Sequence, residues 1–343
     1  MTRTISYAQA ICEATDQEMM CDPSVVLLGQ GVDDFKGFVG TTEGLAKKYG
    51  PRRVMDTPLS EDGMTGVAIG MALAGLRPIH THIRMDFTLL AMNQIVNIAA
   101  KSRYMFGGSV KVPLTVRTVI GRSWGQGAQH SQGLHAMFAH VPGLEVVARS
   151  TPLDAKGCLI SAIRDDNPVV FVEHRMAHLS KGIVPEKSYT VPLGKARVLV
   201  AGGDVTIVGI SHMVVECLRA AHKLTGVGIQ AEVIDPVTLT PLDIETIVAS
   251  VRQNRRLVVV DTAWNFCGMT AEIVAQVAER LPGVTVKRVG FAHVPCPTTK
   301  NLENLFYPNA STIAGAAHEL VCGKFWQPPY EETSEIIEFK GPF

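Results

Sequence analysis

The chain has 343 residues, of which 46% are hydrophobic and 19% charged, so it can form sizeable cores and is not intrinsically disordered. Its length favours about two domains. Lysine plus arginine and aspartate plus glutamate number 32 each, and this balance argues against nucleic acid or an acidic membrane surface as a partner.

The seven cysteines are scattered and form no C-x-x-C pair, which is typical of reduced thiols in a cytoplasmic protein. The first twenty residues lack the apolar core of a signal peptide. No apolar run approaches the ~20 residues that a membrane-spanning helix needs. We therefore expect a cytoplasmic protein.

The first half of the chain alternates helices with short buried strands. In chain order we expect helix 6–19, strand 25–28, helix 42–48, a strand ending at Met55, a helix after Ser60, strand 77–83, helix 86–101, strand 112–120, loop 121–130, helix 131–140, strand 144–148, helix 151–163 and strand 169–173. Such alternation predicts a parallel sheet covered by helices.

The second half repeats the same alternation after an aperiodic segment. The expected elements are strand 205–210, helix 213–224, strand 230–234, helix 241–251, strand 257–260, helix 268–279, strand 284–289 and helix 311–321. The predicted fold class is α/β, with two doubly wound domains. We expect them at 1–180 and 196–322, joined by a linker at 181–195 and followed by an extended tail at 323–343.

The stretch 54–75, VMDTPLSEDGMTGVAIGMALAG, leads from a strand through a Pro-containing turn into a helix rich in glycine and alanine. The Ser60 hydroxyl is expected to cap this helix, which places Glu61 in its first turn. So slim a helix allows another helix, a subunit or a cofactor to approach closely. Glu61 is thus a candidate functional residue, although an acidic residue here also stabilises the helix through its dipole, by about 0.3–1 kcal/mol.

His130 closes the glycine-punctuated polar loop 121–130. Its imidazole can titrate near neutral pH, but a loop histidine can equally serve only to hydrogen-bond neighbouring side chains. Glu61, Phe87 and His130 follow three successive strands, whose carboxyl ends should share one edge of the sheet. A carboxylate, an aromatic ring and an imidazole at one crevice suit a flat nitrogen heterocycle.

His80 and His82 share one face of a strand. Two ligands bind zinc only weakly, because a zinc site takes three or four, so buried polar packing is the favoured interpretation.

Four segments, DTPLSEDGMTGVAIGMALAGLRP, GQGAQHSQ, AIRDDNPVVFVEH and VIDPVTLTPLD, carry a resemblance to a known family. The chain resembles the beta subunit of the thiamin-diphosphate-dependent decarboxylase components of 2-oxo acid dehydrogenases, such as the pyruvate and branched-chain types. The resemblance covers about 6–321. It implies a transketolase-like pyrimidine-binding domain followed by a transketolase-like C-terminal domain.

The resemblance also implies roles for individual residues. Glu61 falls on the glutamate that hydrogen-bonds the cofactor's pyrimidine and so activates the cofactor. Phe87 falls on the aromatic residue that packs against the pyrimidine, and Leu59 and Ile83 line the same pocket. His130 falls on an active-site histidine near the reacting substrate.

Asp165 and Asn167, with the carbonyl of Ala162, match a structural monovalent-cation site that the family often fills with K⁺. An ordinary helix-ending turn before Pro168 explains the same residues equally well.

The G-D-G motif with which thiamin enzymes bind the diphosphate through Mg²⁺ does not occur in the sequence. The resemblance therefore implies a partner alpha subunit that carries the Mg²⁺–diphosphate half-site, an alpha2beta2 heterotetramer, and a lipoyl acyltransferase core as a further partner.

Three functions remain open at this stage. The first is oxidative decarboxylation of a 2-oxo acid with acyl transfer to a lipoyl domain. The second is a split transketolase-like or acyloin-forming carboligase that transfers an acyl or ketol unit to an aldehyde. Three features motivate this second function. They are the basic residues that precede Phe87, the presence of Arg122 and Trp124 in the loop before His130, and the long tail. The third is a subunit without turnover, which retention of Glu61, Phe87 and His130 together disfavours.

Overall fold

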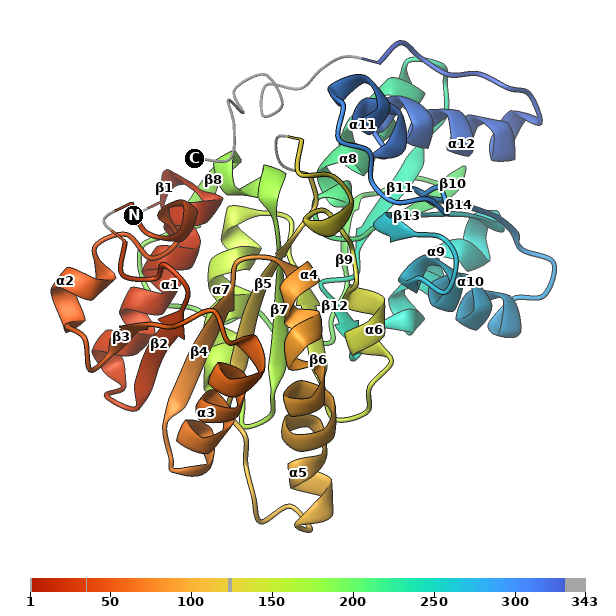
Figure 1. The fold of residues 1–343 in the computed structure, drawn as a ribbon. Coiled ribbons are helices and arrows are strands. Elements are labelled where there is room, and N and C mark those ends of the chain that lie inside the picture. The colour runs from red at the N-terminus through yellow and green to blue at the C-terminus, as the bar shows by residue number, and fades with distance from the viewer. Residues whose placement is uncertain (1, 35, 123–124, 331–343) are drawn as a thin grey trace. The chain divides into compact units, whose positions relative to one another are not determined.

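A computed structural model describes residues 2–34, 36–122 and 125–330 (Figure 1). The chain forms two compact units. The first unit comprises Met1–Ile120 and Met137–Leu193, and the second comprises Gly121–Ala136 and Gly194–Phe343.

Helices and strands alternate through the first unit. In chain order they are β1 (Thr2–Ser6), α1 (Tyr7–Cys21), β2 (Val25–Gly29), η1 (Phe38–Gly40), α2 (Leu45–Tyr49), β3 (Val54–Asp56), α3 (Glu61–Leu73), β4 (Arg77–His82), α4 (Met85–Thr88), η2 (Leu89–Ala91), η3 (Asn93–Ala99), α5 (Ala100–Met105), β5 (Thr115–Ile120), β6 (Glu145–Ala148), α7 (Pro152–Arg164), β7 (Val169–His174), η5 (Arg175–Leu179) and β8 (Lys181–Pro185). The short helix α6 (His135–Ala139) begins in the second unit and ends in the first.

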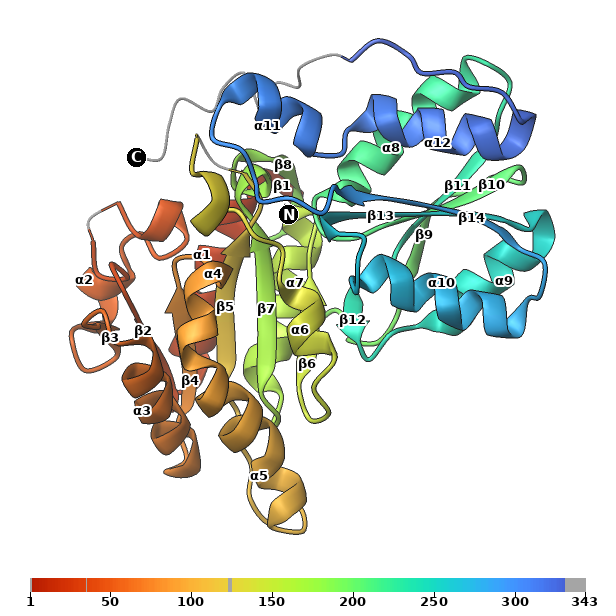
Figure 2. The same ribbon diagram turned by 45° about the vertical axis from the view of Figure 1, so that its right-hand side comes forward.

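The main sheet of the first unit has the strand order β6-β7-β5-β4-β2-β3, and every neighbouring pair in this order is parallel. Helices α1 and α7 lie together on one face, and α3, η3 and α5 cover the other (Figures 1 and 2). Residues of β2, β5 and β7 are buried throughout, as expected for strands covered on both faces. The carboxyl ends of the strands share one edge, where open parallel sheets bind ligands.

The second unit has its own sheet, with the order β14-β13-β10-β11-β9. Four of these strands are parallel, and β9 pairs with β11 in the antiparallel sense. Figure 2 shows α8 and α12 on one face and α9 and α10 on the other. The elements of this unit are η4 (Gly127–Gln129), β9 (Arg197–Val200), β10 (Val205–Gly209), α8 (Met213–Thr225), β11 (Ala231–Asp235), β12 (Thr238–Thr240), α9 (Ile244–Asn254), β13 (Arg256–Trp264), α10 (Met269–Arg280), β14 (Thr285–Phe291), α11 (Lys300–Phe306) and α12 (Ala310–Cys322).

Two helix-covered, mainly parallel sheets confirm the predicted α/β class. Among the described residues, no helix is both long enough and apolar enough to cross a bilayer.

Some local expectations differ from the structure. The helix expected at 86–101 is divided into α4, η2, the π-helical η3 and α5. Part of the expected linker 181–195 forms β8, which pairs antiparallel with β1. Ser60 occupies the N-cap position of α3, but its hydroxyl makes no capping hydrogen bond. Of the expected tail 323–343, residues 323–330 contain neither helix nor strand, and 331–343 lie outside the described residues.

Candidate active site

Glu61 is the first residue of α3 and follows the turn after β3 at the carboxyl edge of the first sheet. The Gln30 side chain, which follows the neighbouring strand β2, donates from Nε2 to Glu61 Oε1 at 3.0 Å. The loop carrying Gln30 is held in turn, because the Gly31 N–H donates to Asp56 Oδ1 at 2.7 Å. One carboxylate oxygen of Glu61 is thus oriented by a neutral amide on the next strand.

Apolar side chains occur on neighbouring segments at the same edge of the sheet. Leu59 lies in the turn before α3 and is 83% exposed, and Ile83, just beyond β4, is 38% exposed. Phe87 lies in α4, which directly follows, and is half-buried. Two segments of the chain thus bring these residues to the carboxyl edge of the sheet: the segment after β3 carries Leu59 and Glu61, and the segment after β4 carries Ile83 and Phe87. Accessible apolar groups beside an oriented carboxylate fit an aromatic, nitrogen-containing ring.

A buried polar cluster lies beneath α3. His80 Nε2 and Thr65 Oγ1 are 3.1 Å apart, His82 Nε2 and Thr65 Oγ1 are 3.4 Å apart, and the two imidazole rings meet edge to face at 4.4 Å. Burial lowers the pKa of His80 to about 4, against weaker opposing effects from the Leu28 backbone and the Glu61 carboxylate. Burial also lowers the pKa of His82 well below its usual value. Both rings are therefore neutral at physiological pH, in agreement with polar packing.

His130 belongs to the second unit and follows η4 in a loop with left-handed glycines at 125 and 127. It is half-buried. A Cβ at Gly127 would come within 2.6 Å of Thr298 Oγ1, so the loop lies directly against the segment before α11. Trp124, which the sequence places near His130, is outside the described residues.

Of the expected cation site, Ala162 lies in the last turn of α7, and Asp165 and Asn167 lie between α7 and β7, at the amino ends of the strands and so at the opposite edge of the sheet from Glu61. The Asp165 N–H donates to the Ala162 carbonyl at 3.3 Å. Asp165 Oδ1 accepts from Asn167 N and Nδ2 at 2.7 and 2.9 Å. Arg103 Nη1 donates to Asn167 Oδ1 at 2.7 Å. These bonds describe a helix-ending turn.

A second carboxylate increases the negative charge near that turn. Burial raises the pKa of Glu145 to about 7, and the charge of Asp165 contributes in the same direction. A cation held by the Ala162 carbonyl and Asp165 would offset this repulsion. Within the described part of the chain, no group of three or more His, Cys, Asp or Glu side chains is arranged to hold a metal ion.

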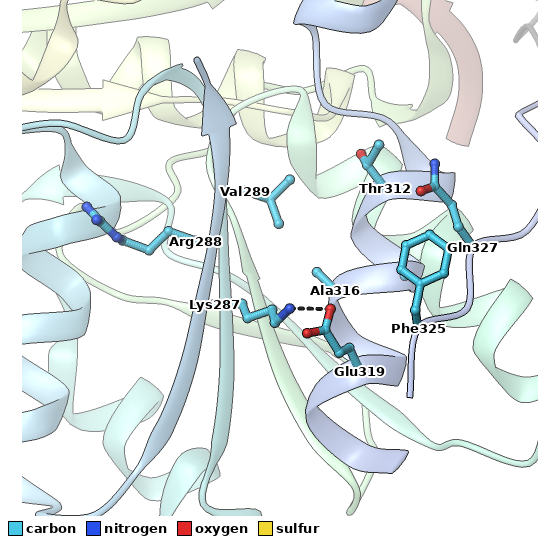
Figure 3. Close-up of a pocket in the computed structure, with 9 residues that line it drawn as sticks. Lys287, Arg288, Val289, Thr312, Ala316, Glu319, Phe325 and Gln327 are labelled. Atoms are coloured by element: carbon cyan, nitrogen blue, oxygen red, sulfur yellow. Dashed lines mark ion pairs between the residues drawn. The ribbon is translucent and has the colours of Figure 1, made fainter. Parts of the chain in front are cut away.

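A separate pocket of about 460 Å³ lies between β14 and α12 of the second unit (Figure 3). Lys287 and Glu319 form an ion pair within it, and the Arg288 side chain points away from α12. None of the residues expected to be catalytic lines this pocket. Lys287 and Glu319 neutralise each other, and the guanidinium of Arg288, which also lines the pocket, donates to the Asn265 carbonyl at 2.6 Å.

Sequence reasoning missed two contacts made by residues in or near the candidate site. Gln30 lies in a stretch, GQGVDD, that resembles half of a dinucleotide-binding motif and gives no signal for contact with Glu61. His135, close to His130 in sequence, forms a buried pair with Asp261, which is 126 residues away. Contacts between such distant residues have no periodic signature.

Comparisons with known proteins agree with this architecture. The family model described as "Transketolase, pyrimidine binding domain" matches residues 3–179, and "Transketolase, C-terminal domain" matches residues 194–313. A solved structure named "Split gene transketolase, inactive beta4 tetramer" is similar with a TM-score of 0.79 over 92% of this chain and 98% of that chain. At 23% sequence identity, this likeness concerns the fold alone.

Curated relatives match over nearly their whole length. The beta subunit of acetoin:2,6-dichlorophenolindophenol oxidoreductase from Cupriavidus necator is 44% identical, over 94% of this chain and 99% of that protein. The Bacillus subtilis protein of the same name is 41% identical, over 94% and 98%. The pyruvate dehydrogenase E1 component subunit beta-1 of Arabidopsis thaliana is 42% identical, over 92% and 89%. The chain therefore belongs to the transketolase-like family of thiamin-diphosphate-dependent 2-oxo acid dehydrogenase E1 beta subunits, in which the acetoin oxidoreductase beta subunits are also found.

Proposed function

We propose that this enzyme subunit completes a thiamin diphosphate site with an alpha subunit and that the enzyme cleaves the carbon–carbon bond beside the carbonyl of acetoin or a similar 2-hydroxy ketone. The observation that carries the reaction class is the Glu61 carboxylate, oriented by Gln30 among accessible apolar side chains. The relatives from Cupriavidus necator and Bacillus subtilis, matched over almost their full length, support acetoin as the substrate.

The residues of this chain have distinct roles in the proposal. When bound, thiamin diphosphate supplies a nucleophilic carbon and an electron sink for the electron pair of the cleaved bond. Glu61 would hold the pyrimidine by a hydrogen bond, and Gln30 keeps that carboxylate in place. Leu59, Ile83 and Phe87 would pack against the bound ring and shield it from water. His130 donates a proton to, or accepts one from, the substrate oxygen.

An alpha subunit is required because the chain has no G-D-G motif for the Mg²⁺–diphosphate end of the cofactor. The name "subunit beta" of the relatives supports such a partner. The assembly that we propose is an alpha2beta2 heterotetramer. Exposed apolar side chains occur on the mutually adjacent elements α3, η2, η3 and α5, and we call them the apolar partner face: Val67, Leu73, Leu90, Ile98, Tyr104 and Met105. Such a group on one side of a sheet is typical of a protein interface.

A 2-oxo acid such as pyruvate is the second candidate substrate, with a lipoyl domain of an acyltransferase core as acceptor. The Arabidopsis thaliana relative, at 42% identity, favours it. The carboligase alternative, in which an aldehyde accepts the acyl or ketol unit, predicts a product without net oxidation.

The compartment that we propose for the assembly is the cytoplasm, on the strength of seven cysteines that are all free.

The decisive experiment uses the chain co-purified with its alpha subunit, thiamin diphosphate and Mg²⁺. Reduction of 2,6-dichlorophenolindophenol is measured with acetoin, pyruvate and a branched 2-oxo acid. We expect the highest kcat/KM with acetoin. A higher kcat/KM with a 2-oxo acid would instead assign the enzyme as a 2-oxo acid dehydrogenase component. Carboligation without dye reduction would favour the carboligase. Absence of thiamin-dependent turnover with every donor would refute the function.

The cation site stays part of the proposal, with K⁺ held by the Ala162 carbonyl, Asp165 and Asn167. The repulsion between the carboxylates of Glu145 and Asp165 supports K⁺ binding, and the hydrogen bond from Arg103 to Asn167 argues against it. Thermal unfolding in KCl and in tetramethylammonium chloride at equal ionic strength tests it. A melting temperature that is higher in K⁺, and no longer so in Asp165→Ala, is expected. Equal melting temperatures in the two salts would contradict K⁺ binding.

A further inference from the structure

The loop that carries His130 is anchored by a buried polar pair of the second unit. His135 Nε2 donates to Asp261 Oδ2 at 2.7 Å. The His135 side chain is wholly inaccessible to solvent, and that of Asp261 is 1% exposed. His135 begins α6, five positions after His130, whereas Asp261 lies within β13, a strand paired on both sides in the sheet. The pair therefore ties the end of the loop to a rigid element.

Other contacts hold the loop on either side of His130. Tyr307 OH donates to the Ser131 carbonyl at 3.5 Å, and the Arg122 guanidinium lies 5.4 Å from the centre of the Tyr307 ring. Arg122 Nη1 donates to Asn304 Oδ1 at 2.7 Å. His130 is consequently placed between an anchor at Arg122 and an anchor at His135.

Close packing also restricts the backbone between His130 and His135. A Cβ at Gly133 would come within 2.1 Å of the Thr262 carbonyl oxygen and 3.1 Å of the Ala263 Cβ, so only glycine fits without displacing the chain. Thr262 adjoins Asp261 on β13. The segment from Gly133 to His135 therefore contacts β13 at two successive residues. Gly133 packs against Thr262, and His135 is hydrogen-bonded to Asp261.

Burying a polar pair of this kind costs free energy of desolvation. Within the described residues, neither His135 Nδ1 nor Asp261 Oδ1 has a hydrogen-bond partner. Two apolar side chains of similar size usually join elements at least as firmly as a buried ionic pair does. A hydrogen bond differs from apolar contact because it is directional, and so it selects one rotation and register of the segment that it holds.

We infer that His135 and Asp261 are positioning residues, whose hydrogen bond sets the location of the His130 imidazole for its step in the reaction. This inference rests on the proposed function of His130. It extends the site to a pair of residues that need not touch substrate or cofactor. Since a displacement of about 1 Å in a reacting group can cost about 100-fold in rate, the pair should affect kcat more than KM.

The test compares three variants in the complete alpha–beta complex with thiamin diphosphate and Mg²⁺. Asp261→Asn keeps an oxygen that accepts from His135 and should retain kcat within about threefold. Asp261→Leu removes the acceptor. The double variant His135→Leu/Asp261→Leu replaces the pair by apolar contact, so its melting temperature should recover to near the wild-type value, while kcat stays about 10- to 100-fold lower. Gly203→Ala is the matched control, because its added Cβ meets nothing within 4 Å.

If the pair only stabilises the fold, kcat of the double-leucine variant should recover together with its melting temperature. That result would overturn the inference. The same double variant is also made in a His130→Ala background. If the pair acts through His130, it should cause no further loss there, and an equal loss in both backgrounds would overturn the inference.

Hydrogen exchange of residues 126–134 gives a readout that does not depend on activity. It should be faster in the double-leucine variant than in the wild type or Gly203→Ala, and unchanged exchange would contradict the anchoring role. Full activity of His130→Ala would remove the role of His130 and with it the positioning role. The wider function would then still be decided independently, by the loss of turnover in Glu61→Gln.

Discussion

The neutral histidines beneath α3 should make the first unit sensitive to acid. The pKa of His80 is about 4 in the folded chain, lowered mainly by burial, against about 6.5 when it is unfolded. The folded state thus binds fewer protons, so its stability is full above pH ~6.5 and falls as the pH drops towards 4. Between pH 7.5 and 4.5, the linkage relation gives a loss of about 2.5 kcal/mol from His80 alone.

The variant His80→Gln should remove most of this loss, because a glutamine amide can still bond Thr65 but does not titrate. The quantity to compare is the change in unfolding free energy between pH 7.5 and 4.5, since titrating groups remote from His80 cancel between variant and wild type. The charge of His80 also lowers the pKa of the adjacent His82, so the variant removes that contribution as well. Hydrogen exchange of β4 peptides reports it for the first unit, whereas the tryptophans at 124, 264 and 326 all belong to the second. The exposed His140, replaced by glutamine, serves as control. Equal acid losses in His80→Gln and wild type would refute the reasoning.

Three further predictions concern other parts of the first unit. Glu61→Gln keeps the shape of the side chain but not its charge, so turnover of the complex should fall at least about 100-fold with assembly intact; near-normal turnover would exclude the proposed role. Gly70→Leu should leave the isolated chain folded, since a Cβ there meets nothing within 4 Å, but should prevent co-elution with the alpha subunit in gel filtration, and an intact complex would argue against α3 as the interface. Burial, and then the charge of Asp165, raise the pKa of Glu145 from its ordinary value of 4.5 to about 7, so the folded state loses stability as the pH rises from about 4.5 to 7; Glu145→Gln should therefore gain more melting temperature relative to wild type at pH 8.5 than at pH 5.5, and an equal gain at both would contradict this.

The alternation of strands and helices was predictable because buried parallel strands are short apolar runs bounded by turn residues. The sequence places β2, β5 and β7 within a few residues of their observed bounds. The antiparallel pair β1–β8 was not predicted, since it joins residues 2–6 to 181–185 and neither segment is strongly apolar. Pairing of this kind depends on partners that are remote in sequence.

The candidate site likewise has features that the sequence predicts and features that depend on contacts between remote segments. Glu61 and Phe87 could be placed at one edge because each follows a strand of the same parallel sheet. The hydrogen bond from Gln30 was not foreseeable, because it depends on the lateral order of β2 and β3 rather than on their succession along the chain. His130 follows β5 in sequence, yet its loop is grouped with the second unit, where it packs on residues more than 100 positions later.

The groups around Glu61 share a property that bears on its chemistry. Its hydrogen-bond donor is the neutral amide of Gln30, and the nearby His80 is kept uncharged by burial. A lysine or arginine in either place would form an ion pair with the carboxylate and compete with a ligand for its charge. Neutral neighbours orient the carboxylate and leave its charge to act on the bound ring. The acid sensitivity of the first unit follows from the same arrangement, since a histidine that must stay neutral beside the site destabilises the fold once it is forced to accept a proton.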